Sequence, residues 1–279
     1  IGQRMNNEQR LRWLAILAPA IGLLLLGVVF FPDWLPLMLG GALGWIVAGI
    51  FIFGSSRGPM EYKTAVKHLR RSEYKEAVEA MDRLIKAEPD QPNHYRFRAE
   101  LLRLWGKLGR ARRSYEDMLA LASDPADQAV AYNGLAEVDL QAGDYATARI
   151  NAQKAYDLAP DEWVAAYNLG MIDDRLGDAQ AVVAHLSLVI QNKIPEERHR
   201  LLIHFYLLRA YCRLGDRPSA ESALSDLMRQ RDGYKEWQSI LASDQADTLR
   251  EVLSADLALV GDLFSGEQSL DDLIEAESG

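Results

Sequence analysis

The stretch that decides the fold is "AYNGLAEVDLQAGDYATARINAQKAYDLAPD", residues 131–161. Gly143 marks a turn near its middle, with Ala136 seven residues before it and Ala148 five residues after it. Small side chains at these two positions let a pair of helices approach closely, and the glycine permits a tight turn between them. Pro160, 17 residues past the turn, ends the second helix. The stretch therefore predicts a hairpin of two packed helices.

The same pattern occurs five times along the chain. The turn residues are separated by 34, 37, 34 and 38 positions, and they are Ser72, Gly106, Gly143, Gly177 and Gly215. The positions seven before each turn are Ala65, Ala99, Ala136, Gly170 and Leu208, and those five after it are Ala77, Ala111, Ala148, Val182 and Ala220. Self-similarity at this period indicates stacked helical hairpins, and the Ala-, Leu-, Arg- and Glu-rich composition also favours helix. The sequence predicts an all-α fold.

These features resemble the tetratricopeptide repeat (TPR) family over residues 58–230, in five units. The most specific pieces are "AAYNLGMIDDRLGD", residues 165–178, and the opening stretch, which carries the family's tyrosine, small residue, Gly-Asp-Tyr, alanines and closing proline in order. The first unit has Ser72 in place of the turn glycine, as expected where terminal units are atypical. The resemblance implies a right-handed helical-repeat solenoid. The first helix of each unit would line a concave groove that takes a peptide, a helix or another protein.

Alignment with the family places partner-binding residues on the first helices of units two to five. Arginine and aromatic side chains predominate among them, which suits a segment with carboxylates and an apolar anchor. The alternative is that the aromatic rings pack between units and the arginines are solvated. The residues are Arg96, Arg103, Asn133, Glu137, Tyr167, Asn168, Met171, Phe205, Tyr206, Arg209 and Arg213.

Two uncharged, mostly apolar stretches precede the repeats, at residues 13–31 and 34–53. Each matches the roughly 20 residues needed to cross a bilayer, and Pro32-Asp33 between them predicts a turn. Cationic residues lie in 1–12 and again after residue 57. The sequence thus predicts a transmembrane hairpin over residues 13–54, with both termini and the repeat domain cytoplasmic. A cleaved signal peptide is a weaker alternative, because its apolar region is typically shorter and is not followed by a second span.

Small residues at four-residue spacing mark the second of these stretches. Gly40, Gly44 and Ala48 would form a smooth face where another helix can approach closely. That face would pack either against the first span or against a transmembrane helix of a larger complex. The sequence leaves both open.

The C-terminal region is strongly acidic. Residues 232–279 contain twelve acidic side chains against Lys235 and Arg250, within a net charge of -9 for the whole chain. Residues 231–264 are expected to form helices that cap the solenoid, and residues 265–279 an acidic flexible tail or a short docking segment built on Leu270, Leu273 and Ile274. The tail could rest on the basic second unit and compete with an acidic partner. Alternatively, that unit could rest on anionic lipid headgroups.

No catalytic, cofactor or metal site is evident in the sequence. The single Cys212 excludes an intrachain disulfide and a multi-cysteine metal site, and the negative charge argues against nucleic acid as a partner.

We therefore expect a non-enzymatic scaffold, without cofactors, in a bacterial inner or photosynthetic membrane. It would serve as an accessory subunit or assembly factor of a photosynthetic, respiratory or envelope complex, contacting its subunits and the lipid bilayer. The alternative is a regulatory adaptor that recruits soluble cytoplasmic proteins to the membrane. The oligomeric state stays open.

Overall fold

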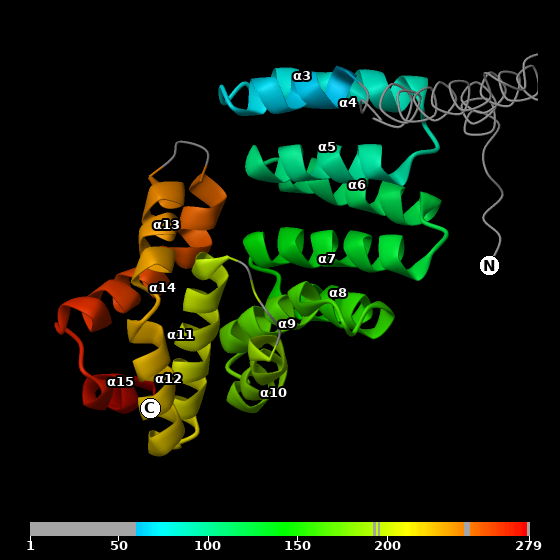
Figure 1. Ribbon diagram of the computed structural model, residues 1–279. Helices are drawn as coiled ribbons and strands as arrows, with labels where there is room; N and C mark the ends of the chain where they lie inside the picture. The colour runs from blue at the N-terminus through cyan, green and yellow to red at the C-terminus, as the bar shows by residue number, and fades with distance from the viewer. Residues whose placement is uncertain (1–59, 192–193, 195, 243–245, 278–279) are drawn as a thin grey trace, which may run out of the picture. The chain divides into compact units, whose positions relative to one another are not determined.

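The described part of the chain is entirely helical. The computed structural model describes residues 60–191, 194, 196–242 and 246–277. The chain divides into two units, Ile1–Met60 and Glu61–Gly279, and the described residues other than Met60 belong to the second (Figure 1). The helices are α3 (Met60–Leu69), α4 (Tyr74–Ala87), α5 (Pro92–Leu104), α6 (Leu108–Leu121), α7 (Pro125–Gln141), α8 (Tyr145–Leu158), α9 (Trp163–Leu176), α10 (Ala179–Ile190), α11 (Glu197–Arg213), α12 (Arg217–Met228), α13 (Arg231–Leu241), α14 (Asp247–Ser265) and α15 (Leu270–Glu277). The predicted all-α class is confirmed for these residues.

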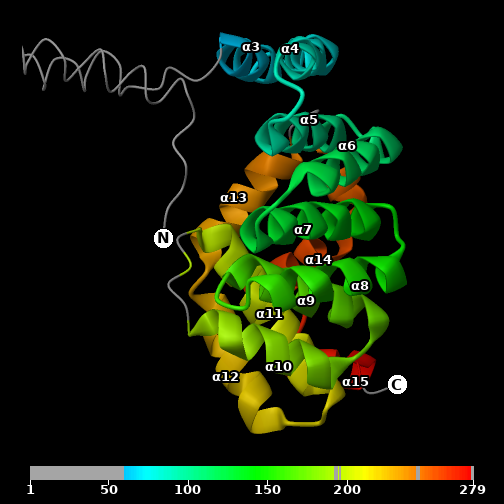
Figure 2. The ribbon, with the colours of Figure 1, turned by 90° about the vertical axis from the view of Figure 1, so that its right-hand side faces the viewer.

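Helices α3 to α12 form five successive hairpins, which stack one upon the next (Figures 1 and 2). We number them as units one (α3–α4) to five (α11–α12). Each predicted turn residue has a positive φ, from 61° at Ser72 to 78° at Gly143. An aspartate follows the glycine in units three to five and caps the second helix. In unit three, for example, Asp144 accepts a hydrogen bond from the Thr147 amide at 3.1 Å.

The small residues of the repeat lie where the two helices of a unit meet. Ala65, Ala99 and Ala136 on first helices are completely buried, as are Ala77 and Ala111 on second helices. Gly170 on α9 shows how close the approach is, because a Cβ there would lie 2.3 Å from Cδ2 of Leu186 on α10. The predicted close packing within each hairpin is present in the described units.

Two buried aspartates tie neighbouring units together. Asp139 on α7 accepts from Asn151 Nδ2 on α8 at 2.8 Å and forms an ion pair with Arg112 on α6. One unit later, Asp173 on α9 is 2.8 Å from His185 on α10 and accepts from Arg149 Nε on α8 at 2.6 Å. Both carboxylates are fully buried, so each needs these partners. The repeated arrangement fixes the spacing from the second unit to the fourth.

Within the region expected to be a flexible tail or a short docking segment, residues 270–277 form the helix α15. Ser269 and Asp272 cap the helix reciprocally: the Ser269 amide donates to Asp272 Oδ2 at 2.9 Å, and the Asp272 amide donates to Ser269 Oγ at 3.2 Å. Leu273 is buried, and Leu270 and Ile274 pack beside it against the core. These apolar residues lie on one face of the helix, which explains why the segment docks on the array.

The predicted transmembrane hairpin at residues 13–54, with Gly40, Gly44 and Ala48, lies outside the described residues. Among the described residues, no helix combines the length and the apolar character needed to span a bilayer. The longest, α14 with 19 residues, carries charged side chains such as Asp247, Arg250 and Asp256 along its length. The expected localisation as an integral membrane protein is corrected on this finding and is not carried further.

Candidate functional site

The first helices of the units form an inner surface, and helix α14 lies along it. We define the inner surface as the side of α5, α7, α9 and α11 that carries Arg103, Glu137, Asn168 and Leu202. Figure 2 shows α14 running behind α7 and α9. Thr248 near the start of α14 lies 3.5 Å from where a Cβ of Gly106 in unit two would be. The groove predicted from the sequence therefore already holds a helix of the same chain.

A cavity of about 240 Å³ remains between the inner surface and the helices α13 and α14. Leu140, Met171 and Leu202 on the array face Leu249 and Val252 on α14 across it. Its wall is thus mostly apolar, with a few polar groups. This composition is typical of a site that receives a side chain or a small apolar group.

The polar groups of the cavity form a ladder across units two to four. Arg103 Nη2 on α5 lies 3.1 Å from Glu137 Oε2 on α7, and Asn168 Nδ2 on α9 donates to Asn133 Oδ1 on α7 at 2.9 Å. Burial alone would lower the pKa of Arg103, but the Glu137 carboxylate and the Tyr115 hydroxyl offset this and raise it. Arg103 therefore stays charged, and the ladder presents fixed hydrogen-bonding groups toward α14.

Four rings join α9, α11 and α13 at the edge of this cavity. His199 lies edge-on to Trp163, Tyr167 and Trp237, with ring centroids 5.6, 5.1 and 6.3 Å away. Burial lowers the pKa of His199, with a further contribution from Arg198, so its imidazole is neutral near pH 7. A neutral ring suits this aromatic setting, where edge-to-face pairs add packing energy. Trp237 also donates from Nε1 to the Arg198 carbonyl at 2.8 Å, which anchors α13.

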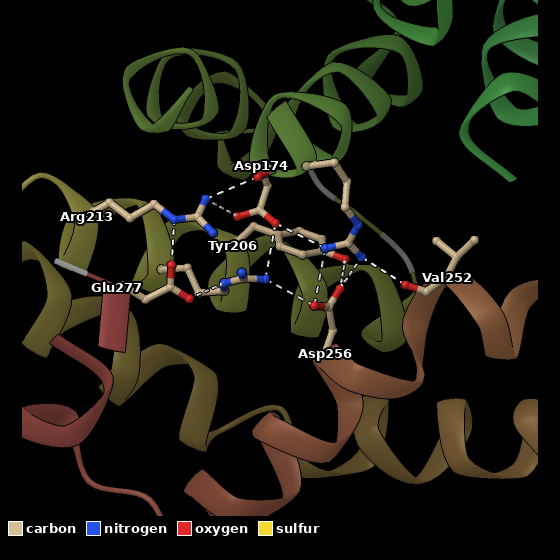
Figure 3. Close-up of polar contacts among 8 residues, drawn as sticks. Asp174, Tyr206, Arg213, Val252, Asp256 and Glu277 are labelled. Atoms are coloured by element: carbon tan, nitrogen blue, oxygen red, sulfur yellow. Dashed lines mark hydrogen bonds and ion pairs between the residues drawn. The ribbon is translucent and has the colours of Figure 1, made fainter. Parts of the chain in front are cut away.

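The charged groups at the end of the inner surface form an arginine cluster, defined as Arg175 on α9 with Arg209 and Arg213 on α11. Figure 3 shows Arg213 of this cluster with Asp174 and Glu277. All three donate to Asp174 on α9, with Arg213 Nη1 at 2.9 Å from Oδ1 and Arg209 Nη1 at 3.2 Å from Oδ2. Asp174 is buried, and burial raises its pKa while the three guanidinium groups oppose that rise. The cluster is therefore centred on one buried carboxylate of the array itself.

Two further carboxylates reach the arginine cluster from the C-terminal helices. Asp256 on α14 accepts from Arg209 Nη1 at 3.1 Å and forms an ion pair with Arg175. Glu277 on α15 accepts from Nε of Arg209 at 2.8 Å and from Nε of Arg213 at 2.6 Å. Burial alone would lower the pKa of Arg209, but the carboxylates around it raise it. The array supplies three guanidinium groups and the Asp174 carboxylate, which leaves two positive charges. Asp256 on α14 and Glu277 on α15 supply the two negative charges that neutralise these.

Comparison of the sequence with protein-family models and with curated proteins finds no match. Solved structures do match. The crystal structure of MamA aligns with a TM-score of 0.52 at 19% identity, over 62% of this chain and 96% of that one. The Pseudomonas aeruginosa pilF structure aligns with a TM-score of 0.55 at 18% identity, over 84% and 99%. The APC/C hetero-tetramer Cut9-Hcn1 gives 0.54 at 15% identity, over 92% and 53%. The described chain has the fold of a TPR array.

Within this TPR array, the residues predicted for the groove separate into three groups. Five line the cavity: Arg103, Glu137, Tyr167, Asn168 and Met171. Tyr206 and Arg209 contact Asp256, and Arg209 and Arg213 contact Glu277. Arg96 instead pairs with Glu100 on α5 at 3.1 Å, Asn133 supports Asn168, and Phe205 is completely buried. The structure thus brings most of the predicted residues to one side of the array.

Several residues of the site were not singled out from the sequence. Arg175 and Asp174 precede the turn at Gly177, where the repeat pattern assigns them no role. Asp256 and Glu277 are two acidic residues among many near the C-terminus, and nothing local distinguishes them. One feature of the sequence does indicate a helix here: Leu273 and Glu277 are four residues apart, so they share a helix face, and the segment begins with the capping residue Ser269. Among the described residues, no group of histidine, cysteine or acidic side chains is arranged to hold a metal ion.

Proposed function

We propose that this chain is a non-enzymatic protein-interaction scaffold whose TPR array holds a helical segment of a partner along its inner surface. The observation that carries the proposal is that this surface already accommodates α14 as a helix. It receives α14 through apolar side chains around Leu253 and through one carboxylate, that of Asp256. Binding an amphipathic helix in a groove is a common mode of protein recognition.

In this role the chain serves as an accessory subunit or assembly factor that keeps other proteins together. The inner surface supports the role by combining a fixed polar ladder, from Arg103 to Asn168, with an apolar cavity. Groups held in place by the array lose little entropy on binding, which favours a specific partner. A regulatory adaptor would use the same surface with a partner that exchanges.

Site-specific photo-cross-linking tests the proposal. A photoreactive phenylalanine analogue at Met171, in the cavity, is compared with the same analogue at Ile150, which is 57% exposed on α8. We expect a discrete adduct with another protein from Met171 and none from Ile150 in the native cells. Stoichiometric adducts would indicate a subunit, and substoichiometric ones an adaptor. Adducts from Ile150 alone, with only intrachain products at Met171, would contradict the proposed use of the inner surface.

A further inference from the structure

The arginine cluster is built to receive carboxylates from outside the repeats. We propose that Arg209 and Arg213 form a binding site for an acidic amphipathic helix of a partner protein, and that α15 occupies this site as an exchangeable internal ligand. This inference rests on the proposed scaffold function and names the class of partner.

The arginine cluster carries more positive charge than the array itself neutralises. Among the described residues of the array, Asp174 is the one carboxylate that pairs with the arginine cluster, so two positive charges are left for other elements to balance. The Nε atoms of Arg209 and Arg213 both donate to Glu277, at 2.8 and 2.6 Å. Two guanidinium groups that converge on one carboxylate form strong, directional hydrogen bonds. Any segment that replaces α15 must therefore offer a carboxylate at this position.

Leu273 is the apolar residue that anchors α15 on the array. Leu273 lies four residues before Glu277, so both point to the same face of α15. Its side chain is 1% exposed and belongs to the main core cluster. The recognition element is thus a leucine and a glutamate one helical turn apart. Its outward face carries Asp271 and Glu275, both exposed, so a matching partner helix would be acidic as well as amphipathic.

Helix α15 is held by few contacts of its own. It has eight residues, and it is separated from α14 by a turn in which Gly266 has a φ of 81°. A helix of this length is marginal in isolation and depends on its docking contacts. Besides the contacts of Glu277 and of the apolar face, α15 has an ion pair between Asp271 and Arg217 at 2.8 Å, where both side chains are more than half exposed. Such a pair contributes little, so loss of the Glu277 contacts should release the helix.

Cys212 provides a native reporter for this release. It is the only cysteine in the chain, it lies next to Arg213 on α11, and it is 1% exposed. Burial raises the pKa of its thiol to about 11, and the nearby Glu277 carboxylate adds to the rise. When α15 is docked, the thiol should react slowly with 5,5′-dithiobis(2-nitrobenzoate), because thiolate is the reactive form. Undocking removes the Glu277 charge and the packing of α15 on α11, so the thiol should become more reactive.

The experiment uses the full chain and its Glu277→Gln variant, with Glu275→Gln as the matched control on the exposed face of the same helix. The probe is a fluorescent peptide of residues 266–277, "GEQSLDDLIEAE". We expect Glu277→Gln to bind the peptide about tenfold more tightly than the wild type, because its internal competitor is weakened. A peptide carrying Glu277→Gln should bind about tenfold more weakly than the unchanged peptide. Glu275→Gln should change neither affinity.

Thiol reactivity is the second measurement. Cys212 should react about tenfold faster in Glu277→Gln than in the wild type, and saturating peptide should slow it again. Equal thiol rates in all three proteins, or no peptide binding to Glu277→Gln, would mean that α15 is a fixed part of the fold and would overturn the inference. Concentration-dependent dimers of Glu277→Gln that exclude the peptide would identify a second copy of the chain as the occupant, and would overturn it too. None of these outcomes alters the cross-linking at Met171, so failure here is distinguishable from failure of the scaffold proposal.

Discussion

Tyr206 on α11 donates its hydroxyl hydrogen to Oδ2 of Asp256 on α14 at 2.8 Å. The phenol is completely buried and the carboxylate is 5% exposed. Burial, together with the Asp256 charge, raises the pKa of Tyr206 well above its usual value, so the hydroxyl remains a donor across the physiological range. This bond joins the fifth unit to a helix fifty residues later in the chain. It is one of the contacts that hold α14 on the inner surface.

Replacing Tyr206 by phenylalanine should destabilise the protein while keeping the ring. Asp256 would keep its arginines but lose one donor, and a buried acceptor that loses a partner costs about 1–3 kcal/mol. We expect Tyr206→Phe to lower the free energy of unfolding by this amount in urea denaturation. Tyr211→Phe, on the same helix with a partly exposed ring, is the matched control and should stay within about 0.5 kcal/mol of the wild type. Equal values for the two variants would refute the assigned role of the hydroxyl.

Gly134→Ala should test the close approach between units. A Cβ at Gly134 on α7 would lie 2.2 Å from Cε1 of Tyr115 on α6, and Tyr115 is buried and has little room to move. Overpacking of this kind costs about 1–3 kcal/mol. Gly109→Ala on α6 is the control, since a Cβ there meets nothing within 4 Å, and it should be neutral or stabilising by up to about 1 kcal/mol. Thermal unfolding of both variants measures the difference, and a stabilised Gly134→Ala would contradict the packing.

Asp173, the buried aspartate of unit four, should contribute more to the free energy of unfolding than Asp178, the exposed helix cap of the same unit. Asp173→Ala leaves Arg149 and His185 without their shared carboxylate, and breaking a buried pair of this type costs about 3 kcal/mol. Asp178→Ala in the same unit removes only the cap on the Ala181 amide, at about 1 kcal/mol. Urea unfolding distinguishes the two. If Asp173→Ala lowers the free energy of unfolding no more than Asp178→Ala does, Asp173 does not hold units three and four together.

Stability should fall in acid through His204. Burial lowers its pKa to about 4, with help from Arg229 and Arg200, whereas the ordinary value is 6.5. The unfolded chain therefore binds a proton that the folded protein does not take up between these values. The stability is fully present above pH 6.5 and is lost as the pH falls toward 4, by about 2 kcal/mol once the partial exposure of the ring is allowed for.

The check for His204 is a comparison of urea unfolding at pH 7 and pH 4.5 in the wild type and in His204→Gln. Glutamine has no charge to gain, so the variant should lose less stability between the two pH values. An identical loss in both proteins would show that His204 is not the titrating group. Other groups contribute equally to the two proteins and cancel in this comparison.

The hairpins could be predicted from the sequence because their determinants are local. A turn residue with positive φ occurs in every unit, and small residues flank it on both sides in units one to three; even Ser72 adopts the turn with a φ of 61°. The path of α14 could not be predicted this way, since Arg175 and Asp256 are 81 residues apart and neither stands out in its own segment. Phe205 and Tyr206 illustrate the consequence for the site. The repeat pattern assigns them to an open groove, whereas both are completely buried in the core.

The position of α14 also has a consequence for how the chain folds. In a simple repeat array each unit contacts only its neighbours, so unfolding can proceed unit by unit. Here Thr248 lies beside Gly106 in unit two and Asp256 contacts unit five, so a helix synthesised late bridges segments made much earlier. Contacts of such long sequence separation slow folding and couple the units into one transition. During translation the inner surface would stay uncovered until α14 has left the ribosome, so units two to five would be made before the helix that connects them. Pulse proteolysis of ribosome-bound chains stalled before and after α14 should show protection of units two to five rising together only in the longer chain.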